Sequence, residues 1–126
     1  MEFAYVLEKS LSFEEAESRF RDAIESVGLK VVGEVMPSEK IKKGLRIDIP
    51  PYKILLICHA KYMYDMLQMN YNIAALVPCH GIVYEKDGKV YVGVDFATQK
   101  VAPAGEEFVK MLEDAEKKLK EAVDKV

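Results

Sequence analysis

The pattern of apolar and polar positions divides the first part of the chain into a strand-like and a helix-like segment. Residues 3–7 are apolar and aromatic, which predicts a strand. Apolar residues then recur at helical spacing over about 12–27. The sequence Ser12-Phe13-Glu14-Glu15 fits a capping box at the start of this helix, and Gly28 is placed to end it in a left-handed cap.

The next two strands are predicted from β-branched and apolar runs. Residues 29–36 form the first of these runs. Ser38 is then placed to cap a short helix that ends at Gly44. Residues 52–58 are almost continuously apolar, which is typical of a strand that is covered on both faces.

The second half of the chain predicts a broken helix and a hairpin. Residues 61–76 carry an apolar stripe that favours helical turns on either side of Asn70. Residues 81–85 and 90–95 then flank the turn sequence Lys86-Asp87-Gly88-Lys89, which predicts two antiparallel strands.

A long C-terminal helix is predicted over about 106–126. Its apolar positions repeat four and three residues apart: Phe108, Leu112, Ala115, Leu119, Ala122 and Val126. This repeat suits a coiled-coil seam with a second copy, and it equally suits packing across the domain's own sheet. Both interpretations stay open at this point.

Together these segments predict an α+β fold. We expect a mixed, mainly antiparallel sheet of about five strands, with helices packed on it and the long helix at the C-terminus. The 126 residues (1–126) are expected to form a single domain, since a chain of this length can bury a core without a disulfide or a structural metal.

Charge and composition narrow the classes of function. The chain has 18 Lys and Arg against 21 Asp and Glu, and the two signs are interspersed, so we expect no nucleic-acid partner. No apolar run is long enough to span a bilayer and no secretory leader precedes the first strand, so we expect a cytoplasmic protein without a membrane partner. Abundant Glu and Lys with few Asn, Gln and Thr are typical of thermophile proteins.

All the cysteines and histidines of the chain lie in two identical dipeptides, Cys58-His59 and Cys79-His80. Thiolate and imidazole are ligands for zinc and copper, so the four residues predict a transition-metal site. Neighbouring residues of a strand point to opposite faces, and therefore two couples that each share a face, Cys58 with Cys79 or His59 with His80, are favoured over one complete tetrahedral site.

Two other interpretations of the dipeptides stay open. Cys58 and Cys79 can cycle between dithiol and disulfide in thiol redox or sulfur transfer, if a histidine lowers the pKa of a thiol. Alternatively, both cysteines are small buried hydrophobic residues without chemistry. A nucleophilic Cys-His couple would also need a third group to orient it, and Asp65, Glu85 and Asp95 are only candidates for this role. We therefore do not expect an enzyme.

The segment between the dipeptides is rich in Met and Tyr. Such residues pack irregular cores or line pockets. The candidates to line a pocket for a small apolar ligand are therefore Met63 and Met66 of this segment, together with Tyr84 after the second dipeptide. This gives a third interpretation, in which the protein is a non-catalytic homodimeric scaffold that binds such a ligand.

Several short motifs, in order and spacing, resemble the family named Domain of Unknown Function 302. These are Phe13-Glu14-Glu15, Gly28, Lys43-Gly44, Pro51, Leu67-Gln68, Asn70, Leu76-Val77-Pro78, Val83-Tyr84-Glu85, Asp87-Gly88-Lys89-Val90 and Asp95. The resemblance covers about 10–97 and leaves 104–126 as a C-terminal helical extension. It implies an α+β sheet with helices and a homodimer, but no established reaction. Both Cys-His dipeptides lie where the chain departs from the family's pattern.

Overall fold

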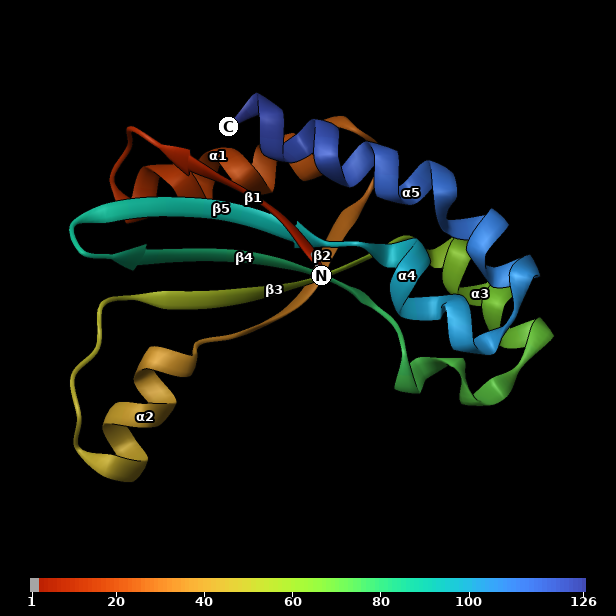
Figure 1. Ribbon diagram of the computed structural model, residues 1–126, viewed down its shortest axis with the longest axis horizontal. Helices are drawn as coiled ribbons and strands as arrows, with labels where there is room; N and C mark the ends of the chain where they lie inside the picture. The colour runs from red at the N-terminus through yellow and green to blue at the C-terminus, as the bar shows by residue number, and fades with distance from the viewer. Residues whose placement is uncertain (1–2) are drawn as a thin grey trace.

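The computed structural model describes residues 3–126 and contains a five-stranded sheet in the order β1-β5-β4-β3-β2 (Figure 1). The strands are β1 (Ala4–Lys9), β2 (Lys30–Val35), β3 (Tyr52–Cys58), β4 (Cys79–Lys86) and β5 (Lys89–Asp95). The helices are α1 (Phe13–Ser26), α2 (Pro37–Leu45), α3 (Ala60–Met69), α4 (Ala97–Val101) and α5 (Glu106–Lys125), with 3-10 turns η1 (Tyr71–Ala75) and η2 (Ala102–Ala104). All four pairs of neighbouring strands are antiparallel, and the predicted α+β class is confirmed.

One face of the sheet, here called the inner face, carries the main core. α1 and α5 pack on this face, as Figure 1 shows. Alternate residues of the central strands point into the core and are buried, among them Leu55, Val83 and Val92. Phe20 of α1 and Leu119 of α5 lie in the same cluster and are completely buried. The hydrophobic effect therefore fixes both helices to this face.

The apolar repeat of α5 is used inside the molecule. Phe108, Leu112, Ala115, Leu119 and Ala122 are all buried, divided between the main core and a second cluster that also holds α4 and Met66 of α3. Packing across the domain's own sheet is therefore confirmed. A coiled-coil seam with another chain would need the same side chains, and they are not free to form one.

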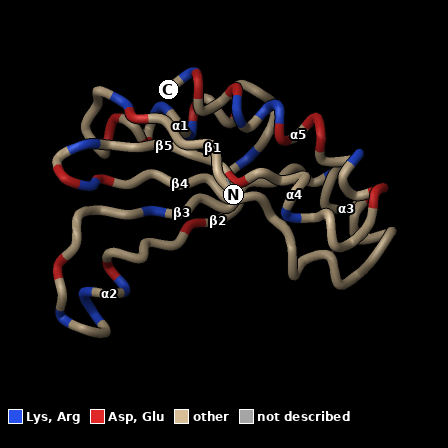
Figure 2. The backbone as a smooth tube through the Cα atoms, in the orientation of Figure 1, with Lys and Arg blue, Asp and Glu red and all other residues tan. Residues whose placement is uncertain are grey.

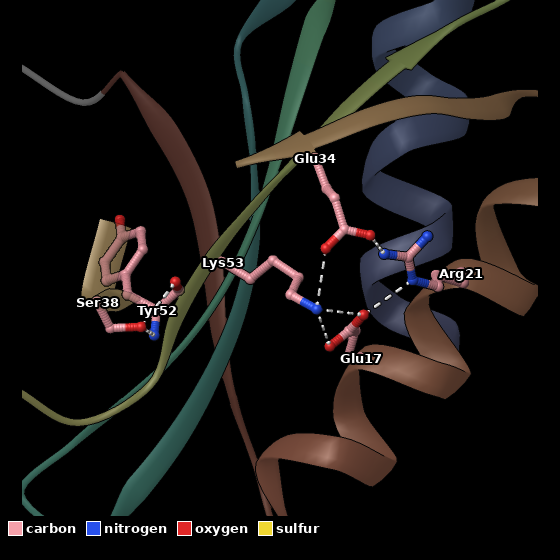
Figure 3. A network of polar contacts seen from close by, with 6 residues as sticks. All are labelled: Glu17, Arg21, Glu34, Ser38, Tyr52 and Lys53. Atoms are coloured by element: carbon pink, nitrogen blue, oxygen red, sulfur yellow. Dashed lines mark hydrogen bonds and ion pairs between the residues drawn. The ribbon is translucent and has the colours of Figure 1, made fainter. Parts of the chain in front are cut away.

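A network of four ionic groups joins α1 to β2 and β3 (Figure 3). Lys53 Nζ lies 3.0 Å from Glu17 and 3.2 Å from Glu34, and Arg21 contacts the same two carboxylates at 2.9 and 2.8 Å. Burial works against the charge of Lys53, but hydrogen bonds and charge attraction from Glu17 and Glu34 outweigh it and raise its pKa. The shared ions fix how α1 sits beside the two strands.

The capping role predicted for Ser38 is wrong. α2 begins one residue earlier, at Pro37, and no side chain caps it. The Ser38 hydroxyl instead accepts a hydrogen bond from the Tyr52 backbone N–H at 3.1 Å and ties α2 to the start of β3 (Figure 3). The helix ends at Arg46, which adopts a left-handed backbone conformation, rather than at Gly44.

The opposite face of the sheet, here called the outer face, is only partly covered. Its apolar side chains alternate with those of the core, and Ile54 and Leu56 of β3 and Ile82 of β4 stay partly exposed. α2 packs against β3, near its start, and projects away from the sheet in Figure 1. The expectation that residues 52–58 are covered on both faces is thus met on the inner face only.

Gly81 allows β4 and α1 to approach closely. A Cβ atom at this position would lie 2.8 Å from a ring carbon of Phe20 and 2.9 Å from the Ile57 Cδ1 atom. Because both neighbours are buried in the core, we expect Gly81→Ala to lower the free energy of unfolding by about 1–3 kcal/mol. Urea unfolding followed by circular dichroism measures this loss.

Gly44→Ala is the matched control. A Cβ atom there meets nothing within 4 Å, and the residue lies in the last turn of α2. The substitution should leave stability unchanged or raise it slightly, since alanine favours a helix over glycine. Equal stability of Gly81→Ala and the native chain would contradict the close packing described here.

Candidate functional site

The two cysteines line one small internal cavity. Cys58 ends β3 and Cys79 begins β4, and the register of this strand pair places Cys79 opposite Ile57, one residue from Cys58. The cavity has a volume of about 20 Å³, roughly one water molecule. Its wall also includes His59 and Met66, and otherwise apolar residues of β3, α3 and α5. Of the two couples predicted from strand alternation, the cysteine couple therefore shares a cavity.

The surroundings keep both thiols protonated. Burial raises the pKa of Cys58, although a hydrogen bond from the backbone of His59 acts in the opposite direction. Burial, and after it the Asp95 carboxylate, raises the pKa of Cys79 to about 12. The redox interpretation needs a thiol of lowered pKa, and neither cysteine provides one.

The two histidines lie in different environments. His59 is the N-cap of α3, where its Nδ1 accepts a hydrogen bond from the Lys61 backbone at 3.1 Å. His80 pairs with Leu56 in the sheet and lies on the outer face, beside Asp95 and Lys100. The predicted couple of His59 with His80 is therefore not brought together, because β4 turns Cys79 and His80 to opposite faces.

The arrangement as a whole lacks the ligand set of a tetrahedral metal site. In residues 3–126 no group of three or more Cys, His, Asp or Glu side chains is placed to hold one metal ion. Cys58, His59 and Cys79 border the internal cavity, whereas His80 does not. Of the four predicted ligands, at most the two cysteine thiols are therefore placed to bind the same metal ion.

The pocket expected from Met63, Met66 and Tyr84 is not formed by these residues together. Met66 is buried and borders the cysteine cavity, and Met63 packs against the second core cluster. Tyr84 lies on the outer face, where it lines a different and much larger groove. The sheet separates Tyr84 from the two methionines.

This larger groove, here called the outer groove, has a volume of about 710 Å³. It is lined by Phe3, Ala4, Val6, Ile49, Pro50, Tyr52, Ile82, Tyr84, Glu85 and Lys86. Three tyrosines stack beside it across the strands, with ring centroids 5.1 Å apart from Tyr52 to Tyr84 and again from Tyr84 to Tyr91. The groove therefore offers an apolar floor and a flat aromatic wall.

A polar cluster lies on the same face of the sheet. Lys100 Nζ is 2.9 Å from His80 Nδ1, 2.9 Å from Asp95 Oδ2 and 2.8 Å from the Pro78 carbonyl oxygen. Sequence reasoning named Asp95 as a candidate partner but missed Lys100, since the five-residue helix α4 is too short to show an apolar period. The apolar alternation of Ile54, Leu56 and Ile82 is the signal that marks the outer face, and Ile82 lines its groove.

Comparison with protein families identifies the fold's relatives. The sequence model of the family described as "Domain of unknown function DUF302" matches residues 5–126. The chain belongs to the DUF302 family. The match includes α5 as well as the segment of about 10–97 that carries the sequence resemblance.

A solved structure of a DUF302 protein has the same fold. It is the crystal structure of an uncharacterised conserved DUF302 protein from Bacillus stearothermophilus, which is 23% identical to this chain. The alignment covers 99% of this chain and 98% of that chain with a TM-score of 0.89. None of the curated proteins compared with the chain is similar to it. The likeness establishes the fold and carries no activity over.

Figure 2 shows acidic and basic residues alternating along α5 rather than gathering in one basic patch. Among the helices described within residues 3–126, none combines the length and apolar character needed to cross a membrane.

The raised pKa of Cys79 predicts a loss of stability in alkali. The thiol ordinarily ionises near 9.0, so above that pH the unfolded chain releases a proton that the folded chain retains up to about 12. The folded state therefore binds more protons in this window, and stability falls as pH rises through it. Urea unfolding of the native chain and Cys79→Ala across this range should show a smaller alkaline loss in the variant.

Thiol reactivity provides an independent measurement. In Cys58→Ser, which retains only Cys79, alkylation by iodoacetamide should stay slow near pH 9 in the folded state and proceed at an ordinary rate in urea. Fast alkylation of the folded variant at that pH would show that Cys79 is neither buried nor protonated as described.

Proposed function

We propose that this DUF302 protein is a small, non-catalytic binding protein that holds an apolar ligand in the outer groove. The observation that carries the proposal is the groove itself, about 710 Å³ on the incompletely covered face of the sheet. Ligand sites of small molecules commonly have volumes of about 300–1,000 Å³ and mostly apolar walls. By contrast, the cysteine cavity has room for little more than one water molecule.

The sequence of the outer face supports this proposal. A face that only met water would carry polar residues at alternate positions, as antiparallel sheets commonly do. Here Ile54, Leu56 and Ile82 occupy those positions and stay partly exposed. Exposed apolar patches of this kind mark binding surfaces, because covering them with an apolar molecule removes unfavourable contact with water.

A charge on the floor of the groove should weaken binding. We expect the native chain to bind the neutral fluorescent probe N-phenyl-1-naphthylamine saturably, and Ile82→Lys to bind it at least about tenfold more weakly, since an ammonium would have to be desolvated. Fluorescence titration measures both affinities.

Val32→Lys is the matched control for this substitution. Val32 is 61% exposed on the edge strand β2 and does not line the groove, so its replacement should leave probe affinity unchanged. Native protein that fails to bind the probe saturably, or an Ile82→Lys variant with native affinity, would contradict a ligand site in the outer groove.

A homodimer remains part of this proposal, through a surface other than α5. Leu45 at the end of α2 and Ile47 in the following segment are 68% and 51% exposed. Clustered apolar residues of this kind are typical of contacts between proteins. We place the contact with a second copy here, since the apolar side chains of α5 are already buried.

A second candidate function is the binding of a soft metal ion by the thiol pair. The specific observation in its favour is that Cys58, Cys79 and Met66 border one cavity, together with His59. Thiolate and thioether sulfur suit Cu(I). A bound cation would also lower the pKa values that burial raises, since it stabilises the thiolates.

Metal analysis distinguishes this second candidate from two unreactive buried thiols. After anaerobic reconstitution with Cu(I) or zinc, the native chain should retain about one ion, and Cys58→Ser and Cys79→Ser should lose it. His80→Phe, which changes the outer face only, should retain the ion. Native protein that stays free of metal, or Ser variants with unchanged content, would leave the cysteines as core residues.

A further inference from the structure

The polar cluster on the outer face fixes the protonation pattern of His80. A lysine ammonium has donors and no acceptor, so Lys100 Nζ donates a hydrogen bond to His80 Nδ1 over 2.9 Å. In a neutral imidazole the hydrogen then resides on Nε2. His80 therefore presents an N–H donor on the side of its ring away from Lys100.

Asp95 holds this arrangement in place. Its Oδ2 accepts hydrogen bonds from Lys100 Nζ at 2.9 Å and from the His80 backbone N–H at 3.1 Å. Lys100 also donates to the Pro78 carbonyl at 2.8 Å, so three acceptors surround the ammonium. Its charge is compensated and its position is fixed by elements on both sides, which limits the freedom of the imidazole it contacts.

The cluster borders a pocket to which His80 contributes one N–H donor. The pocket has a volume of about 360 Å³ and is lined by Phe3, His80, Asp95, Phe96, Gln99 and Lys100. The His80 side chain is 44% exposed, so its Nε2–H is accessible to a ligand. Asp95 Oδ2 is engaged by Lys100, whereas Asp95 Oδ1 is buried without a hydrogen-bond partner. The Gln99 amide offers both a donor and an acceptor.

This pocket adjoins the apolar outer groove. Phe3 lines both, and His80 precedes Ile82 by two residues on β4, which places the two side chains on the same face. Ala4 of the groove is the strand partner of Asp95. A single molecule can therefore lie on the apolar floor and reach the donors of the polar cluster.

We propose that the outer groove selects an amphipathic ligand, with an apolar or aromatic body and a carbonyl or carboxylate oxygen that accepts the hydrogen bond of His80 Nε2. The inference rests on the proposed function and names the chemical class of its ligand. His80 contacts the ligand, and Lys100 is a positioning residue that sets the tautomer of His80.

Three naphthalene probes of matched shape test the head group. 2-Acetonaphthone offers a neutral acceptor oxygen, 2-naphthoate offers a charged one, and 2-ethylnaphthalene offers none. We expect at least one acceptor probe to bind the native chain roughly five- to tenfold more tightly than 2-ethylnaphthalene, the effect of one hydrogen bond in a partly desolvated site. The stronger of the two acceptors distinguishes a carbonyl from a carboxylate ligand.

His80→Phe should remove this preference, so that the ratio of acceptor-probe affinity to 2-ethylnaphthalene affinity falls to roughly one. His59→Phe is the matched control, since His59 caps α3 and does not line the groove. Equal affinities of all three probes for the native chain would overturn the head-group inference alone. If none of the probes binds, the proposed function itself fails.

The role of Lys100 has its own measurement, which needs no ligand. Nitrogen-15 NMR of the native chain above about pH 8, where an imidazole is ordinarily neutral, should show His80 protonated at Nε2. Lys100→Met should give a mixture of tautomers and a lower ratio of acceptor-probe affinity to 2-ethylnaphthalene affinity. A native tautomer in Lys100→Met, or a mixture in the native chain, would overturn the positioning role.

Discussion

The five-stranded sheet has two faces, and the helices of this chain bury only one of them. α1 and α5 supply the apolar surface that covers the inner face, and the second core cluster uses the remaining buried positions of α5. The hydrophobic effect is strongest where apolar area is fully removed from water, so the stability of the fold comes chiefly from this side. The outer face keeps apolar residues that the chain itself does not fully bury, and this is the basis of its proposed role.

The division between the two faces also separates the reactive residues. Cys79 points into the dry interior and its neighbour His80 points to the outer face, because consecutive residues of a strand alternate. Burial then raises the pKa of Cys79, while His80 meets Lys100 and Asp95 beside an open groove. Two neighbouring residues of the dipeptide thus lie in different environments. The interior around Cys79 disfavours a charged thiolate, whereas His80 lies beside the charged groups of Lys100 and Asp95.

Polar contacts also orient the helices around the sheet. The ions shared by Lys53, Glu17 and Glu34 join α1 to the two strands, and a single hydroxyl, that of Ser38, joins α2 to Tyr52. Because α2 is attached at the start of β3, the rest of the outer face is left open. The open groove therefore depends on where one short helix is tied as well as on the pattern of the strands.

The sequence by itself determined the class of fold and most of the elements, though not the short helix α4. Local periodicity, the Ser12 cap and the turn at Asp87-Gly88 are properties of neighbouring residues, and they predicted the strands, α1, α5 and the break at Asn70. Only the tertiary structure decided which face α1 and α5 cover, that α5 packs inward, and that Lys100 reaches His80 from twenty residues away. These are contacts between segments distant in the chain, and they follow from the order in which the strands pair, which local periodicity does not specify.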